Sequence, residues 1–360
     1  MKRGLQLAVI AAAVAAGLAP ISAGTIERRF STTVYPAIQR MMTPLSNVAP
    51  FALFDLLTVA AAIVLIAALV HGARTARREH TFRPLLTTLA HIATAAAVAY
   101  LAFLLLWGFN YRRVPMTERL VMERAAPATD AVVALGLDAV RRLNALHADA
   151  HRIGWTFEPR ENTALVDAYA SVQRRLSDAP AAVPGRLKRS VYGTYFRWTS
   201  VDGMVNPFAL EVLANPDLLP YERPFVAAHE WAHLAGYADE SEANFVGWLT
   251  CVRADVPSQY SGWLSLYWQV AGELSVADRT TLWEALQEGP RADVQAIVER
   301  LRRGQLPLLR NASWRVYDQY LRANRVEEGI RSYGQVITLI LRARFEDGWV
   351  PVRRTGAPSR

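Results

Sequence analysis

Three long runs of apolar residues dominate the first 110 positions of the chain. They cover residues 4–23, 51–70 and 85–109, and Asp55 is the one acidic residue within them. A membrane-spanning helix needs about 20 mainly apolar residues, so the pattern predicts a membrane region, residues 1–110, with three transmembrane helices. The first run could instead be a secretory signal, because Lys2 and Arg3 precede it. The other two runs keep the chain in the bilayer in either case.

The residues after 110 follow mainly helical spacing. Apolar positions recur every three or four residues over 131–150 and 163–176, and again with short breaks from Pro224 to about Arg344. Between Val191 and Val205 the residues are β-branched and aromatic, which favours a small hairpin or irregular sheet. The pattern therefore predicts a mainly α protein, in which residues 111–360 form a helical domain with a small β element.

Charge adds a membrane orientation and argues against a nucleic-acid partner. The chain has 40 Lys and Arg against 32 Asp and Glu, a net charge of +8, but no basic stripe interleaved with aromatic residues. The loop 72–84 holds the densest basic cluster, which favours a cytoplasmic loop, a cytoplasmic N-terminus and an extracytoplasmic domain after residue 110. Arginines in the other loops nearly balance the positive charge of the loop 72–84. The basic cluster of that loop comprises Arg74, Arg77, Arg78 and Arg83.

The segment His229-Glu230-Trp231-Ala232-His233 carries the candidate chemistry. On a helix, residues i and i+4 share a face, so both imidazoles can bind one metal ion. A glutamate beside the first histidine can take a proton from a water at that metal and pass it to a leaving amine. The HExxH pattern also occurs by chance. Here, however, the pattern is followed by Gly236, which suits a left-handed turn, and then by several acidic residues. These following residues favour a Zn²⁺ site.

Three carboxylates compete for the third ligand position. Asp239 fits the metzincin-like spacing HExxHxxGxx(H/D), whereas Glu240 and Glu242 would come from a second helix after the turn. The last two point roughly 200° apart at about 100° per residue, so they cannot both face the metal. Asn244 lies one turn after Glu240 and could brace it. For the others we expect a helix cap at Asp239 and exposure to solvent for the remaining glutamate.

The sequence HEWAHLAGYADESEANF resembles the HExxHxxG…ExEANF pattern of a bacterial membrane-protein family, domain of unknown function 3810. The resemblance extends to residues 107–112, 205–208, 316–324 and 329–334. It implies a gluzincin-type, zinc metallopeptidase-like protein of the bacterial inner membrane, with substrates unassigned. The gluzincin pattern E-x-x-A-(D/N) picks Glu240 as the third ligand and Asn244 as its brace. Residues 208–211 depart from the family, because a more polar stretch is expected there.

Other candidate residues have weaker support. A gluzincin usually has a distal Tyr or His that donates to the oxyanion, and Tyr317 and Tyr333 are the options; the resemblance favours Tyr333. His147 and His151 form a second i, i+4 pair without a glutamate after the first histidine, and we expect them at the surface. Residues 191–196 and 204–206 could form an edge strand that pairs with a peptide, or simply a capping hairpin.

The leading hypothesis is a multi-pass membrane zinc metallopeptidase that uses Glu230 to cleave a peptide or protein substrate. The lone Cys251 excludes an intramolecular disulfide and a multi-cysteine zinc site. A second hypothesis is a non-catalytic sensor or assembly factor with structural zinc, which would have no use for Glu230. A third is hydrolysis of a non-peptide amide at the same site.

Overall fold

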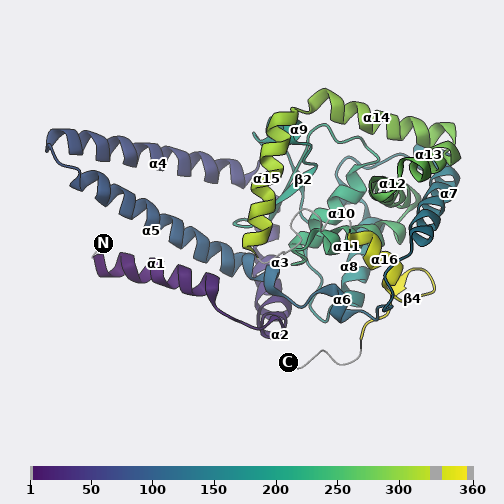
Figure 1. Cartoon of the computed structure of the whole chain (residues 1–360), viewed down its shortest axis with the longest axis horizontal. Coiled ribbons are helices and arrows are strands. Elements are labelled where there is room, and N and C mark those ends of the chain that lie inside the picture. The colour runs from purple at the N-terminus through teal and green to yellow at the C-terminus, as the bar shows by residue number, and fades with distance from the viewer. Residues whose placement is uncertain (1–2, 325–334, 355–360) are drawn as a thin grey trace.

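Helices make up most of the residues that the computed structural model describes, which are 3–324 and 335–354 (Figure 1). The N-terminal elements are α1 (Arg3–Leu18), α2 (Ala23–Ile26), the π-helix η1 (Glu27–Val34), α3 (Tyr35–Val48), α4 (Leu53–Arg78) and α5 (Arg83–Leu106).

A mainly helical body follows the N-terminal elements. Its first half contains η2 (Gly108–Arg112), α6 (Met116–Arg119), α7 (Thr129–Ile153), η3 (Pro159–Glu161), α8 (Thr163–Leu176), β1 (Leu187–Lys188), α9 (Gly193–Thr199), β2 (Gly203–Asn206) and β3 (Glu211–Ala214). Its second half contains α10 (Arg223–Leu234), α11 (Glu240–Val252), α12 (Val256–Glu273), α13 (Val276–Ala285), α14 (Glu288–Gly304), α15 (Pro307–Ala323), α16 (Gln335–Arg342), β4 (Phe345–Glu346) and β5 (Val350–Pro351).

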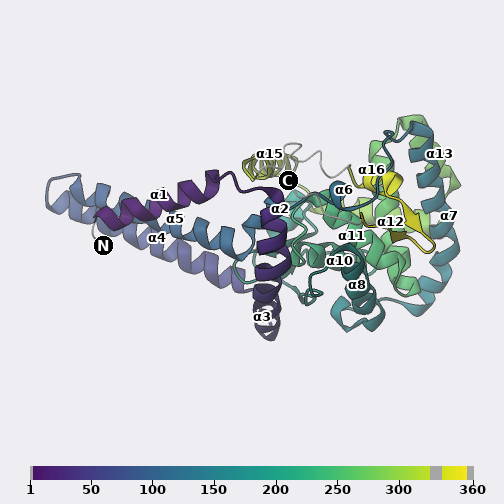
Figure 2. The same ribbon diagram turned by 90° about the horizontal axis from the view of Figure 1, so that it is seen from below.

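Two helices, α4 and α5, are long and apolar enough to cross a membrane. They form a hairpin that projects from one side of the body, with α1 packed beside α5 (Figures 1 and 2). At 1.5 Å per residue, the 26 residues of α4 span about 39 Å, more than the roughly 30 Å hydrocarbon core of a bilayer. Most side chains of α4 are exposed, as expected for side chains that face lipid.

The prediction of a transmembrane helix over residues 4–23, the first of the three apolar runs, is wrong. Helix α1 has 16 residues and a length of about 24 Å, which falls short of the hydrocarbon core. It reaches sufficient length only together with residues Ala23–Val48, from which it is bent by 109°. Pro20 lies in the break, and proline lacks the N–H that would continue the helix.

The segment between the first two apolar runs packs against the body. Its helices α2, η1 and α3 bury several polar side chains. Three of these side chains donate hydrogen bonds to backbone carbonyls of the body: Tyr35 to Leu234, Gln39 to Val183 and Thr43 to Leu210. This segment therefore lies on the same side of the α4–α5 hairpin as the body.

Glu211 joins the first turn of α4 to the body. Its carboxylate accepts hydrogen bonds from the backbone N–H groups of Leu53 and Phe54, at 3.0 and 2.7 Å. Lys188 contacts the same carboxylate at 2.7 Å, and both side chains are fully buried. A negative charge at a helix N-terminus is favourable because backbone N–H groups there lack partners within the helix. Residues 208–211, where a more polar stretch was expected, thus include a residue that anchors the first of the two long apolar helices.

The main sheet is small, and its strand order β1-β3-β2 makes β2 an edge strand. Strand β2 runs antiparallel to β3, with Gly203 opposite Ala214. The prediction of a hairpin over residues 191–205 is wrong in its first part, because residues 193–199 form helix α9. Phe196 of this helix is buried against Leu213 of β3. This packing overrides the β propensity of the aromatic residues.

The other helical predictions are confirmed. Residues 131–150 lie within α7, residues 163–176 form α8, and helices cover most of 224–344 outside the undescribed stretch 325–334. Helix α7 packs along α12, and α10 packs against α11. One apolar core lies around α7, α11 and α12, and a second surrounds α10 and includes Phe103 and Trp107 from the end of α5. The candidate site thus lies close to the membrane hairpin.

Candidate metal centre

A tight turn brings the HExxH helix α10 and helix α11 side by side. Helix α10 starts with Arg223-Pro224, a position where proline costs no hydrogen bond. It ends before Gly236, which has a φ of 84° as the sequence predicts. Asp239 then caps α11 by accepting hydrogen bonds from the backbone N–H groups of Ser241 and Glu242. The turn therefore places the first residue of α11, Glu240, opposite the two histidines.

His229, His233 and Glu240 direct three ligand atoms at one point. The two Nε2 atoms lie 3.1 Å apart, and Glu240 Oε2 lies 3.3 Å from His229 Nε2 and 3.5 Å from His233 Nε2. Zinc binds such atoms at 2.0–2.2 Å, so a tetrahedral shell has edges of about 3.3–3.5 Å. The three measured distances are close to these edges, and the group fits a zinc ion.

Hydrogen bonding orients the ligand atoms. The Tyr237 carbonyl lies 2.7 Å from His233 Nδ1 and can only accept, so that nitrogen carries a proton and the Nε2 atom of the ring faces His229 and Glu240. Among the described residues, Glu240 Oε2 has no hydrogen-bond partner although it is buried. Buried polar atoms are rarely left unpaired. A cation between the three side chains would satisfy this one.

Electrostatics favour an ionised Glu240. Burial by itself raises the pKa of this carboxyl, but His233 and His229 outweigh burial and hold the pKa well below its usual value. For His233, burial by itself lowers the pKa, because it disfavours the charged ring. The attraction of Glu240 outweighs burial and raises the pKa to about 9. The carboxylate form of Glu240 is the form that binds a metal.

Glu230 lies beside this group without joining it. Its side chain is buried, and burial raises its pKa although the two imidazoles oppose the shift. Its Oε2 has no hydrogen-bond partner among the described residues. A Cβ placed on Gly203 of β2 would lie 2.5 Å from Glu230 Oε1, so only glycine leaves room for this carboxylate. An unpaired, buried carboxylate next to three converging ligand atoms is suited to general-base chemistry.

The other two candidate ligands point elsewhere. Asp239 is the helix cap that sequence analysis expected for a residue outside the metal site. We expected Glu242 to be exposed to solvent, but it is buried, with a relative exposure of 6%. Its carboxylate accepts a hydrogen bond from the backbone of Met116 and lies 3.4 Å from Arg119. Glu242 therefore anchors α6 to α11, and the error arose because spacing alone cannot show what covers the second face of a helix.

Tyr317 of α15 contacts Glu240, the candidate third ligand. The sequence had suggested Tyr317 only as an oxyanion donor, and this contact was not predicted. Its hydroxyl donates to Glu240 Oε1, leaving Oε2 to face the histidines. Asn244 is buried and lines a cavity that opens over the two histidines and Glu240. Its bracing role remains a prediction. Tyr333, the other expected oxyanion donor, lies outside the described residues. The i, i+4 spacing pointed to Asn244, whereas no sequence signal connects residues 317 and 240.

A cavity of about 620 Å³ opens over the three converging side chains. This volume is typical of ligand sites, which are mostly apolar with a few polar groups. Its walls include Gly203, Met204 and Val205 of the edge strand β2 and several aromatic side chains. Among the latter are Trp107, Tyr111, Phe225, Trp268, Trp314 and Tyr320.

Side chains from four separate elements hold the C-terminal end of α10. The last carbonyls of a helix lack partners within it, and here side chains supply them. Trp107 at the end of α5 donates to the His233 carbonyl at 3.0 Å, so a membrane helix contacts the backbone of a candidate ligand. The other donors are Tyr35 to Leu234, Arg113 to Gly236 and Tyr169 to Trp231.

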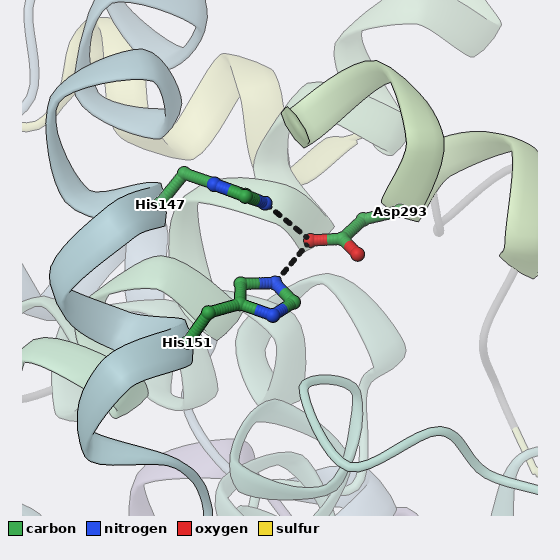
Figure 3. Close-up of side chains that lie close together, drawn as sticks. All are labelled: His147, His151 and Asp293. Carbon is green, nitrogen blue, oxygen red and sulfur yellow. Dashed lines mark hydrogen bonds and ion pairs between the residues drawn. The ribbon is translucent and has the colours of Figure 1, made fainter. Parts of the chain in front are cut away.

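The second histidine pair also faces a carboxylate. His147 and His151 lie on α7 near the surface, as expected, but Asp293 of α14 faces both rings (Figure 3). Asp293 was not predicted, because 142 residues separate it from His151 and no local pattern marks it.

Comparison with known proteins supports one assignment. No curated protein and no solved structure matches the chain. The family described as protein of unknown function DUF3810 matches over residues 30–341, which includes α4, α5, the HExxH helix and α15. The chain therefore belongs to this family.

Proposed function

We propose that the chain is a membrane-anchored, zinc-dependent hydrolase of the metallopeptidase type. The observation that carries the proposal is the spacing of 3.1, 3.3 and 3.5 Å among the ligand atoms of His229, His233 and Glu240. The unpaired carboxylate of Glu230 and the cavity beside it support catalysis over a purely structural role. A structural zinc site would have all its positions closed and would need neither feature.

The residues around the group have distinct roles in this proposal. Zinc, when bound, would supply a Lewis acid that polarises a water molecule and the scissile carbonyl. Glu230 accepts a proton from the attacking water and delivers it to the leaving nitrogen. Its raised pKa suits it to both transfers. Tyr317 orients Glu240 through its hydrogen bond.

Strand β2 is the proposed binding edge for an extended substrate. It is one of the two edge strands of its sheet, and Gly203, Met204 and Val205 line the cavity. An extended peptide can add to such an edge through backbone hydrogen bonds. This would bring the substrate backbone close to Glu230, which touches Gly203.

We propose that the body lies outside the cytoplasm of a bacterial inner membrane. In a two-span hairpin, residues 23–48 before α4 and the body after α5 lie on one side, and the connection between the two helices lies on the other. Arginines cluster at that connection, in the last turns of α4 and at the start of α5, and such clusters stay in the cytoplasm. A C-terminal reporter active only in the cytoplasm would contradict this placement.

The decisive experiment compares wild-type protein with Glu230→Gln, both full-length and in detergent. We expect about one zinc ion at the HExxH site in both proteins, and peptide-library cleavage that falls by about 10²–10⁴-fold in the variant. Glu242→Gln is the matched control, because this buried carboxylate faces Met116 and Arg119 instead of the ligand atoms. It should retain both zinc and cleavage.

Other outcomes would contradict the proposal. Unchanged cleavage in Glu230→Gln would exclude its role as the base. Zinc binding without cleavage of any peptide by the wild type would contradict peptidase activity and favour the sensor or assembly factor. A matching assay with non-peptide amides separates that outcome from hydrolysis of another substrate class.

A further inference from the structure

His147, His151 and Asp293 form a compact group between α7 and α14 (Figure 3). Helix α7 lies on the side of the body away from the α4–α5 hairpin (Figure 1). One ligand atom from each of the three residues lies within 4.8 Å of the other two. Asp293 Oδ2 lies 2.8 Å from His151 Nε2 and 3.5 Å from His147 Nε2. Both imidazoles therefore present the same ring nitrogen to one carboxylate oxygen.

A hydrogen bond between α7 and α14 explains only half of this arrangement. His151 is within hydrogen-bond distance of Asp293, but His147 at 3.5 Å is too far for a strong bond. The two rings nevertheless lie 4.2 Å apart, centroid to centroid. Gly289 leaves room for His147, because a Cβ there would lie 2.3 Å from the ring. The backbone of α14 is thus shaped to admit a second imidazole.

The carboxylate is itself held in place. The Tyr260 hydroxyl donates to Asp293 Oδ2 at 2.5 Å, and the Tyr221 hydroxyl donates to the Asp293 carbonyl at 3.1 Å. The Asp293 side chain is only 10% exposed, whereas those of His147 and His151 are 24% and 37% exposed. Metal ligands are commonly oriented by such outer hydrogen bonds. The remaining coordination positions would face solvent.

We propose that His147, His151 and Asp293 bind a second divalent transition cation of the zinc class. Two imidazoles and a carboxylate suit zinc and its neighbours in the first row. At metal–ligand distances of about 2.0–2.2 Å, the edges of tetrahedral and octahedral shells are about 2.8–3.6 Å. The two measured distances fall in this range. Binding requires only small movements of the rings.

This cation joins helices instead of catalysing a reaction. None of the three ligands lines the cavity over His229, and the sequence has no glutamate after His147. A cation held by α7 and α14 stabilises the folded state, because the unfolded chain does not hold the three groups together. The site is independent of the proposed hydrolase activity.

The test measures Zn²⁺ binding to full-length protein in detergent by calorimetry and elemental analysis. The wild type should bind two equivalents, and a His229→Ala/His233→Ala variant should keep one. Adding His147→Gln to that variant should weaken the remaining binding by at least 10–100-fold, the loss typical of even an outer-shell change. Zn²⁺ should also raise the unfolding temperature of the double variant but not of the triple variant.

Asp149→Asn is the control, since this exposed carboxylate lies on the same helix and pairs with Arg152. It should leave both equivalents intact. If the double variant does not fold, His147→Gln alone decides: a fall from two equivalents to one supports the site, and an unchanged count overturns it. Loss of all zinc from a folded double variant would also overturn the second site without affecting the first.

Discussion

The two His-x-x-x-His pairs of the chain share a local pattern but differ in their surroundings. At both, two imidazoles on one helix face meet a carboxylate from another helix. At His229 and His233 the carboxylate belongs to Glu240, just past the Gly236 turn, the group is mostly buried, and Glu230 and a cavity adjoin it. At His147 and His151 the carboxylate comes from far along the chain, and the rings reach solvent. If both proposals hold, similar ligand sets serve hydrolysis at one pair and helix joining at the other, and the neighbouring base and cavity make the difference.

The largest expected effect tests the ligand set of the first pair. Glu240→Ala should weaken zinc binding at His229 and His233 by more than 100-fold, beyond the range of outer-shell changes. Asp239→Ala should keep zinc and cost about 0.5–2 kcal/mol of stability through loss of a helix cap. Glu242→Ala should also keep zinc, at a cost of about 1–3 kcal/mol, because Met116 N–H loses its buried acceptor.

A zinc titration of these three variants, with unfolding measured alongside, distinguishes them. Loss of zinc in Asp239→Ala but not in Glu240→Ala would make the site metzincin-like. Loss in Glu242→Ala alone would mean that α11 is rotated from its orientation here. The second pair provides an internal reference, since none of the three changes touches Asp293.

Gly203→Ala tests whether the position of Glu230, the proposed base beside His229 and His233, sets the first pair apart from the second. The added Cβ would lie 2.5 Å from Glu230 Oε1 and must displace the carboxylate. We expect hydrolysis to fall by about 10²-fold, toward the lower end of the range for loss of a general base, with zinc affinity nearly unchanged. Parallel measurement of cleavage and zinc content checks this. Unchanged cleavage would argue against a fixed position for Glu230.

Gly289→Ala is the equivalent change at the second pair. Its Cβ would lie 2.3 Å from the His147 ring, so the ring must swing away from Asp293. We expect about 10-fold weaker binding of the second zinc equivalent, comparable to an outer-shell change, with cleavage unaffected. A calorimetric titration that shows two unchanged equivalents would contradict the role of His147 as a ligand.

The smallest effect compares two tryptophans that contact the pairs. Trp107→Phe removes the hydrogen bond to the His233 carbonyl, and Trp155→Phe removes one to the Pro257 carbonyl beside the second pair. Each should cost about 0.5–1.5 kcal/mol in the free energy of unfolding. Trp107→Phe should also weaken zinc binding at the first pair alone. Equal effects of both variants on that site would mean that α5 does not position it.

Local pattern predicted the elements that depend on local spacing. The amphipathic helices α7 and α8, the HExxH helix, the Gly236 turn and the cap at Asp239 follow from residues within one or two turns of each other. It failed at residues 193–199, where burial of Phe196 against Leu213 favours a helix. It also failed at residues 4–23, because apolar composition does not register the break at Pro20.

The sequence alone determined two of the three candidate ligands of the first site, the candidate base beside them and a choice among three carboxylates for the third, because helical geometry fixes i, i+4 neighbours. The tertiary structure decided which carboxylate turns toward the histidines, since the α10–α11 packing and the Tyr317 hydroxyl orient Glu240. It also decided the contacts of Gly203 with Glu230, Trp107 with His233, and Asp293 with the second pair. These contacts join residues 27 to 146 positions apart, and only chain packing brings such residues together.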